Sequence, residues 1–147
     1  MAQTHFTTEQ EQLIVQSIKE AEKKTSGEIR VHIENHCDVD LLDRAADVFA
    51  LLGMHKTALR NGVLFYIAME DHKFAILGDA GINSKVPSGY WNQIKEVMRQ
   101  YFIQKDFTGG ICKGIELAGE KLQEHFPYHS NDVNELADTI SFHSNKK

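Results

Sequence analysis

Three oxygen-bearing side chains of this sequence lie where a small sheet would bring them together. Glu28 opens a strand-like segment, Asn61 comes just before an apolar run, and Asp79 follows the segment that pairs with that run. If the first two strands are parallel and the third returns antiparallel, all three residues lie at one end of the sheet, with Arg60 beside them. Carboxylate and amide oxygens beside a glycine-lined loop are hard ligands, which suit Ca²⁺ or Mg²⁺ better than zinc. The sequence therefore predicts a divalent-cation site at Asp79, Glu28 and Asn61.

Each member of this group also has a purely structural interpretation. Asn61 suits a turn position with left-handed backbone, and Asp79 suits an Asx-turn or a helix cap. Glu28 is able to pair with Arg30 or Arg60 instead of a metal. The sequence leaves both interpretations open.

A second acidic group is expected at the opposite end of the sheet. It follows the carboxyl ends of the parallel strands, where open α/β sheets usually hold ligands, and it comprises Asp38, Asp40, Glu70 and Asp71. The structural alternative is that Asp38 or Asp40 caps a helix, while Glu70 and Asp71 form a hairpin turn. The two groups compete as candidate sites.

The sequence contains few residue patterns that are typical of catalytic sites. His32, flanked by Arg30 and Glu34 two residues away on either side, is a candidate general acid or base, or a buried histidine satisfied by the carboxylate. The histidines and cysteines have no zinc-binding spacing, and no serine lies in a GxSxG elbow. The loop at residues 78–82 lacks the features of a nucleotide-binding loop. No catalytic residue is assigned.

The elements that would position these residues follow from hydropathy patterning. Residues 28–34 alternate apolar and ionic side chains, which predicts a strand with one apolar and one ionic face. Residues 63–69 are continuously apolar, which predicts a strand buried on both faces, and residues 74–78 return after a short turn. A helix predicted to be capped within residues 38–40 and to end at Gly53 separates the first two strands, so these strands should be parallel.

Three further helices complete the expected fold. The first begins with a capping-box pattern at Thr7 and stops by residues 25–27. Another starts at residues 86–88, and the last starts at residues 108–110. The domain should span residues 1–127, and residues 128–147 form a polar, flexible tail with one helical possibility at residues 133–140. We predict a three-layer α/β/α sandwich with a small mixed sheet and helices on both faces.

Bulk composition excludes several classes of protein. The chain has 147 residues, enough for one domain, and a net charge of −5 with scattered basic residues, which argues against nucleic-acid partners. Cys37 and Cys112 show no paired spacing and are expected to be reduced thiols. The longest apolar run, residues 63–69, is too short to span a membrane, and residues 1–6 have no signal-peptide pattern. We expect a cytoplasmic, bacterial protein that is a monomer.

The order and spacing of several segments resemble the TPM domain family. The segments are Ser26–Glu34, which includes the x-E-I-x-V strand pattern; Arg60–Ile82, which opens with N-G-V-L and ends in a glycine-rich loop; and Phe107–Ile111, a glycine-rich helix start. The resemblance covers roughly residues 7 to 127. It implies a Rossmann-like α/β/α sandwich, divalent-metal binding as in some members, and a phosphatase activity like that of a plastid branch.

Two functions follow as hypotheses. The first is a binding or regulatory module in which Ca²⁺ or Mg²⁺ orders the loop at Asp79 and a protein partner contacts the resulting surface. The alternative is a metal-dependent acid phosphatase of phosphomonoesters, in which a metal at Asp79 and Glu28 polarises a phosphoryl oxygen. The sequence favours the binding module, because Arg30 and Arg60 are the only candidates to neutralise a phosphate.

Overall fold

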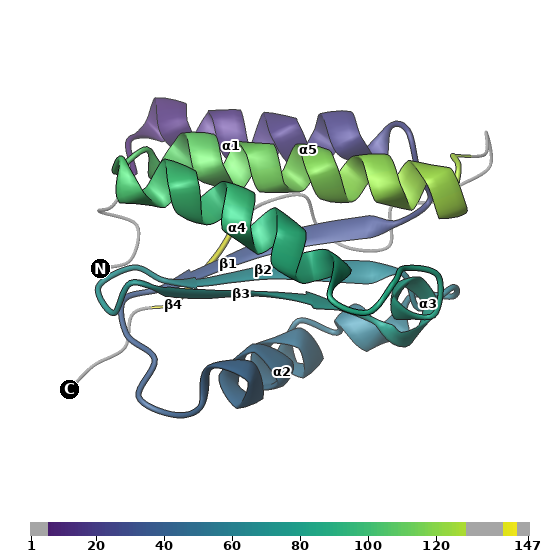
Figure 1. Cartoon of the computed structure of the whole chain (residues 1–147), viewed down its shortest axis with the longest axis horizontal. Coiled ribbons are helices and arrows are strands. Elements are labelled where there is room, and N and C mark those ends of the chain that lie inside the picture. The colour runs from purple at the N-terminus through teal and green to yellow at the C-terminus, as the bar shows by residue number, and fades with distance from the viewer. Residues whose placement is uncertain (1–5, 129–139, 144–147) are drawn as a thin grey trace.

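The structure is a computed structural model that describes residues 6–128 and 140–143. A four-stranded mixed sheet lies between two layers of helices (Figure 1). The strands are β1 (Glu28–Glu34), β2 (Gly62–Ala68), β3 (Lys73–Gly78) and β4 (Ser141–His143), in the spatial order β3-β2-β1-β4. β1 runs parallel to β2 and β4, and β3 runs antiparallel to β2. The predicted strand directions and the predicted α/β/α sandwich are confirmed.

Helices cover both faces of this sheet. One face carries α1 (Thr8–Glu22), α4 (Tyr90–Ile103) and α5 (Phe107–His125), and the other carries α2 (Leu41–Leu51) with the short 3₁₀ helix η2 (Met54–Lys56) (Figure 1). α3 (Ala80–Asn83) is a single turn directly after β3. The helix between β1 and β2 is what permits them to be parallel, because such strands need a long crossover.

The core is divided by the sheet into two apolar clusters. Ile29, Val31 and Ile33 of β1 pack on the side of α1 and α5, whereas Leu64 and Tyr66 of β2 pack on the side of α2. Alternation along β1 therefore places Glu28, Arg30, His32 and Glu34 on the α2 side. Three of these four are buried, with exposed fractions of 4% for Glu28, 5% for His32 and 0% for Glu34. The ionic face that the sequence predicts lies inside the protein.

Side-chain caps set most helix starts. Thr7 and Gln10 form the predicted capping box of α1, and Asp40 caps α2 by accepting from the backbone N–H of Asp43 at 3.0 Å. Asp106 caps α5 in the same way, through the N–H of Gly109 at 2.9 Å. α4 begins later than the sequence suggests, at Tyr90 after the left-handed Gly89, because Pro87 lies in the preceding turn.

Three elements were not predicted from the sequence. η2 follows α2, α3 occupies the loop after β3, and β4 supplies three residues to the edge of the sheet beside β1. The helical possibility at residues 133–140 falls almost entirely on positions 133–139, which lie outside the described residues.

Within residues 6–128 and 140–143, no helix has the length and apolar character needed to cross a bilayer.

Candidate metal centre at the amino ends of the parallel strands

Glu28 and Asp79 lie on either side of Gly62 at one end of the sheet. Glu28 is the register partner of Gly62, and the backbone N–H of Asp79 donates to the Gly62 carbonyl at 2.9 Å. Strand alternation puts both carboxylates on the α2 face, in one row with Gly62 between them. Asn61 is the residue before Gly62, and its backbone carbonyl accepts from the Glu28 N–H at 3.4 Å. The sequence prediction that these three residues share one end of the sheet is in accord with this register.

All three side chains are removed from solvent. Glu28 is 4% exposed, Asp79 is 6% exposed and Asn61 is 1% exposed. Buried polar groups of this kind require partners, because their desolvation is not otherwise offset.

Asp79 has protein partners on both carboxylate oxygens. Arg60 Nε donates to Oδ2 at 2.6 Å, Arg60 Nη2 donates to Oδ1 at 2.7 Å, and the Ala80 N–H donates to Oδ1 at 2.8 Å. Asp79 is thus the N-cap of α3 and half of a bidentate ion pair. The hydrogen bonding of Arg60 to the Asp79 carboxylate raises the pKa of Arg60 above its ordinary value. The capping role of Asp79 is confirmed, and Arg60 is paired with Asp79.

Asn61 differs from Asp79 in its side-chain hydrogen bonding. Neither its Oδ1 nor its Nδ2 has a hydrogen-bond partner among the described residues, although both atoms are buried. The Thr57 hydroxyl, in the same loop, is buried and unpartnered in the same sense. The turn residue with left-handed backbone is Arg60, with φ of 52°, and not Asn61. The turn role considered for Asn61 is therefore wrong, and its burial needs another explanation.

Close backbone packing holds these residues in place. A Cβ at Gly81 would lie 2.0 Å from the Leu59 carbonyl oxygen, so the loop before β2 presses directly on α3. The Gly81 N–H donates to the Arg60 carbonyl at 2.7 Å. At Gly62, a Cβ would lie 3.2 Å from the Met54 carbonyl oxygen, which places a further backbone oxygen over the row on the α2 face.

Asn83 and Trp91 fix the other side of the loop. Asn83 Nδ2 donates to the Gly78 carbonyl at 2.7 Å, and Trp91 Nε1 donates to Asn83 Oδ1 at 2.8 Å. Neither residue is among the candidate site residues predicted from the sequence. The hydrogen bond between Asn83 and Trp91 joins two single residues, so no periodic pattern in the sequence predicts it.

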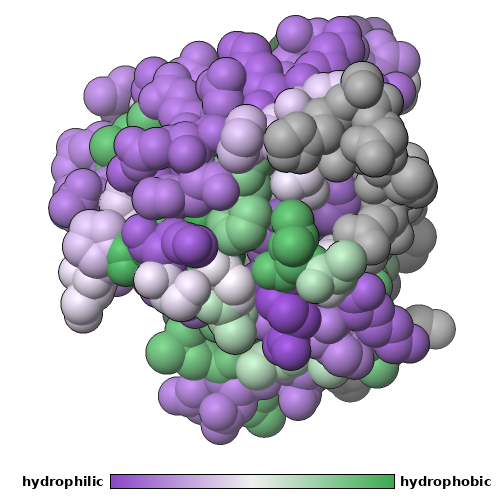
Figure 2. All heavy atoms as spheres, turned by 90° about the vertical axis from the view of Figure 1, so that its right-hand side faces the viewer, coloured by the Kyte–Doolittle hydropathy of each residue, from purple (hydrophilic) through white to green (hydrophobic). Residues whose placement is uncertain are grey.

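The side-chain types at this end are those that a hard cation prefers. The described residues contain no group of three or more His, Cys, Asp and Glu side chains that would hold a metal by themselves. The fit depends on two carboxylates, the orphaned Asn61 amide oxygen and backbone carbonyls, which are the ligands of Ca²⁺ and Mg²⁺ rather than of zinc or copper. This end of the molecule is mixed in character, with an apolar band between polar regions (Figure 2).

At the opposite end of the sheet, several acidic residues have structural roles. Asp40 caps α2, and Asp71 accepts from the Cys37 N–H at 2.6 Å and contacts His36 Nδ1 at 3.1 Å. Glu70 lies 3.6 Å from His36 Nε2. Asp38 is exposed. The cap and the turn proposed from the sequence account for this group better than a ligand site does.

A buried polar network is centred on Glu34, the last residue of β1. Glu34 accepts from Arg44, Tyr66 and His32, the last at 3.2 Å, and His32 Nδ1 contacts the Ser141 hydroxyl at 2.9 Å. Burial alone would raise the pKa of Glu34, but hydrogen bonds from His32, Arg44 and Tyr66 outweigh it and lower the pKa to about 2. His32 is a buried histidine in contact with a carboxylate, which is one of the two interpretations that the sequence offered.

Comparison with known proteins agrees with this architecture. The sequence model of the TPM domain matches residues 2–121. The NMR structure of BA42 protein from the psychrophilic bacterium Bizionia argentinensis is 46% identical with a TM-score of 0.89, and the match covers 94% of this chain and 95% of that one. None of the curated proteins compared with the chain matches it significantly.

Two more distant structures share the fold. The solution NMR structure of the N-terminal domain of a protein from P. gingivalis has a TM-score of 0.67 at 16% identity, covering 86% of this chain and 83% of that one. The N-terminal domain of cg2496 protein from Corynebacterium glutamicum has a TM-score of 0.58 at 15% identity, covering 97% and 81%. The family match over most of the sequence decides the assignment: this chain belongs to the TPM domain family.

Proposed function

We propose that this TPM domain is a binding or regulatory module that takes up Ca²⁺ or Mg²⁺ at the amino ends of β1 and β2. Glu28, Asp79 and the Asn61 amide oxygen would hold the ion, with backbone carbonyls as additional donors. The observation that carries the proposal is Asn61, whose buried amide has no hydrogen-bond partner among the described residues. An unsatisfied amide of this kind destabilises a fold by about 1 to 3 kcal/mol, so its retention calls for a compensating ligand.

Arg60 supports a regulatory role for the site. Its guanidinium pairs with Asp79, yet the Arg60 side chain is 50% exposed. A cation that bound Asp79 would compete with this guanidinium, and Arg60 is free to extend toward water. Leu59, the neighbouring residue, is an exposed apolar side chain at 54%. Cation binding would thus change a loop that offers both an apolar and a cationic group to a protein partner.

The first test is thermal unfolding with and without metal. A ligand that binds only the folded state at ten times its Kd adds about 1.4 kcal/mol to the free energy of unfolding. For a chain of this length that gain corresponds to a rise in Tm of about 3 to 6 °C. Asp79→Asn should remove most of the rise and remain folded, because Asn is also a good N-cap.

The control for this test is Asp106→Asn, which alters another N-cap carboxylate far from the site and should keep the metal-induced rise. A Tm that does not change at millimolar Ca²⁺ and millimolar Mg²⁺ would contradict the proposal.

The alternative function, a metal-dependent phosphomonoesterase, has weaker support. Phosphoryl transfer relies on several positive groups aimed at the equatorial oxygens, and each missing donor lowers the rate about 10²- to 10³-fold by analogy with oxyanion holes. Arg60 already uses Nε and Nη2 on Asp79. Hydrolysis of p-nitrophenyl phosphate at acid to neutral pH is therefore expected to be absent or marginal, with or without metal. Robust turnover that Asp79→Ala abolishes would make the phosphatase the leading function.

A further inference from the structure

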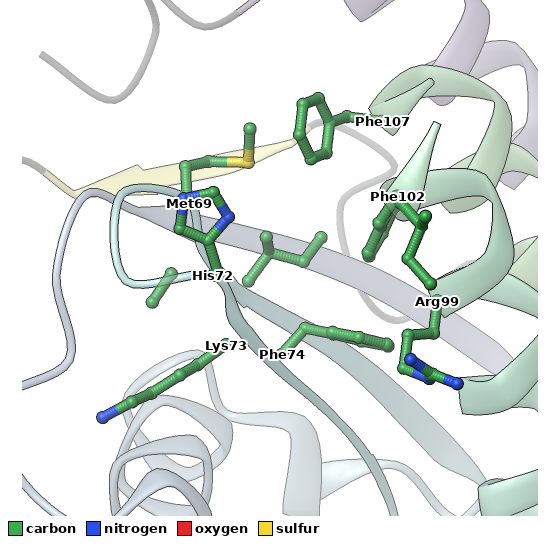
Figure 3. A pocket seen from close by; sticks show the side chains of 10 residues that line it. Met69, His72, Lys73, Phe74, Arg99, Phe102 and Phe107 are labelled. Atoms are coloured by element: carbon green, nitrogen blue, oxygen red, sulfur yellow. The ribbon is translucent and has the colours of Figure 1, made fainter. Parts of the chain in front are cut away.

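An apolar pocket lies at the other end of the sheet from the candidate metal centre. It has a volume of about 230 Å³ and is formed by the β2–β3 hairpin, the end of α4 and the start of α5 (Figure 3). An apolar cavity of about 150 Å³ admits benzene, so this pocket has room for one aromatic ring with a short chain.

Three phenylalanine rings form one side of the pocket. The Phe74 and Phe102 rings meet edge to face, with centroids 4.9 Å apart at 75°, and the Phe102 and Phe107 centroids are 5.6 Å apart. Met69 and the exposed Ile103 add further apolar surface. Aromatic side chains prefer such edge-to-face and offset contacts, so a bound ring would gain more here than an alkyl chain of equal area.

The charged residues that line the pocket itself are basic. The ten residues that line it include His72, Lys73 and Arg99 and contain neither Asp nor Glu. A hollow next to it adds Glu96 and also Lys95, whose ammonium lies 5.2 Å from the centre of the Phe74 ring. Lysine and arginine side chains therefore outnumber carboxylates around the pocket, although the chain as a whole has a net charge of −5.

Arg99 is the best placed of these cations to hold an anion. Figure 3 shows the Arg99 side chain next to the Phe74 ring, whereas Lys73 extends away from the rings. Arg99 donates two hydrogen bonds to Glu96 in the adjoining hollow, from Nη2 to Oε2 at 2.9 Å and from Nε to Oε1 at 3.1 Å, and both side chains are more than half exposed. Because solvent screens an exposed pair, a ligand carboxylate would compete with Glu96 for the guanidinium.

We propose that the pocket binds a small aromatic carboxylate, with its ring among Phe74, Phe102 and Phe107 and its carboxylate on Arg99. A planar guanidinium binds a carboxylate through two parallel hydrogen bonds, which gives the site its preference over neutral and cationic compounds of the same shape. The proposal is independent of the cation site, because no residue is shared between them.

The test is an NMR titration of the whole chain with phenylpropionate, read from methyl and aromatic signals. Saturable shifts are expected at Ile67, Met69, Ile103 and Phe107, with a Kd of about 0.1 to several millimolar, as suits a ligand of about eleven non-hydrogen atoms. Phenylpropanamide should bind about tenfold more weakly and phenylpropylamine more weakly still.

Two variants assign the carboxylate contact. Arg99→Gln should weaken phenylpropionate about tenfold, because a hydrogen bond to a charged group is lost, while leaving phenylpropanamide unchanged. Glu96→Gln should tighten phenylpropionate severalfold by removing the competing carboxylate. Lys113→Gln, at a cation that pairs with Glu116 in the same (i, i+3) manner on α5, should have no effect.

The proposal is overturned if phenylpropionate produces no saturable shifts, or if the shifts map outside the pocket. It is also overturned if the amide and amine bind as tightly as the acid, or if Arg99→Gln has no effect on the acid.

Discussion

The Asn61 side chain is buried, but the described residues do not satisfy its hydrogen-bonding groups. Its amide is 1% exposed, and neither polar atom has a partner among the described residues. Replacing such a group by an apolar side chain of the same shape is often neutral or stabilising, because the desolvation penalty disappears. The unbound protein therefore gains nothing from the asparagine, whereas a bound cation would use its oxygen.

The Asn61→Leu variant distinguishes a structural role of Asn61 from a role as a metal ligand. We expect the variant without metal to unfold at the same Tm as the parent or up to about 4 °C higher, from a gain of about 1 kcal/mol. The rise in Tm on adding Ca²⁺ or Mg²⁺ should largely vanish. Differential scanning calorimetry in chelator and in millimolar metal measures both quantities.

The matched control for this variant is Asn83→Leu, which removes a side chain that has partners on both polar atoms. It should lower the Tm of the metal-free protein. If Asn61→Leu instead lowers the metal-free Tm and keeps the full metal-induced rise, Asn61 is a structural residue and not a ligand.

Elements with a strong periodic signal could be predicted from the sequence. The seven apolar residues of β2 are all buried, and the stripe Ile111, Ile115, Ala118 and Leu122 is the buried face of α5. Those patterns reflect burial over a whole element, which dominates local preferences.

Elements fixed by single contacts were missed. α3 has four residues and exists because Asp79 caps it and Gly81 fits against the Arg60 carbonyl. β4 has three residues, too few for alternation to be recognised, and depends on pairing with β1. The start of α4 depends on the left-handed Gly89. None of these features has a signature in the hydropathy pattern.

Gly81→Ala tests how tightly α3 is joined to the loop before β2. The added methyl would lie 2.0 Å from the Leu59 carbonyl oxygen and 2.5 Å from that of Arg60, so backbone must move. We expect a loss of about 1 to 3 kcal/mol in the free energy of unfolding and a weaker response to metal, measured by urea denaturation. Ser84→Ala, which removes only a hydroxyl bond to the Gly81 carbonyl, should have a much smaller effect. Equal effects of the two variants would contradict this packing argument.

On the scale of the whole molecule, the sheet separates two ends of different chemistry. One end gathers Glu28, Asn61 and Asp79, and the other carries the apolar pocket beside Arg99. The predicted strand directions were sufficient to place Glu28, Asn61 and Asp79 at the same end of the sheet. The Asp79–Arg60 pair and the Met54 carbonyl over Gly62 could not be predicted, because they depend on loop conformation.

The Glu34 network joins the sheet to α2 and should govern acid stability. Because the folded-state pKa of Glu34 is lowered from 4.5 to about 2, its contribution is complete above pH 4.5 and is lost as the pH falls toward 2. Glu34→Gln should lower the free energy of unfolding at pH 7 by about 3 kcal/mol, since Arg44 loses its buried partner. The variant should also show a flatter dependence of stability on pH between 4.5 and 2.

Urea denaturation across this pH range measures both effects. Glu9→Gln, at an exposed carboxylate of α1, is the control and should leave the pH dependence unchanged. A Glu34→Gln variant whose stability falls as steeply in acid as that of the parent would show that other carboxylates are responsible.

The central claim is that a divalent cation binds at the amino ends of β1 and β2, and backbone NMR shifts during titration with Ca²⁺ and with Mg²⁺ test it most directly. The account predicts saturable shifts concentrated at residues 27–29, 57–62 and 78–83, and their loss in Asp79→Asn. Shifts that are absent, or that concentrate at residues 34–40 and 69–73 at the opposite end of the sheet, would contradict it.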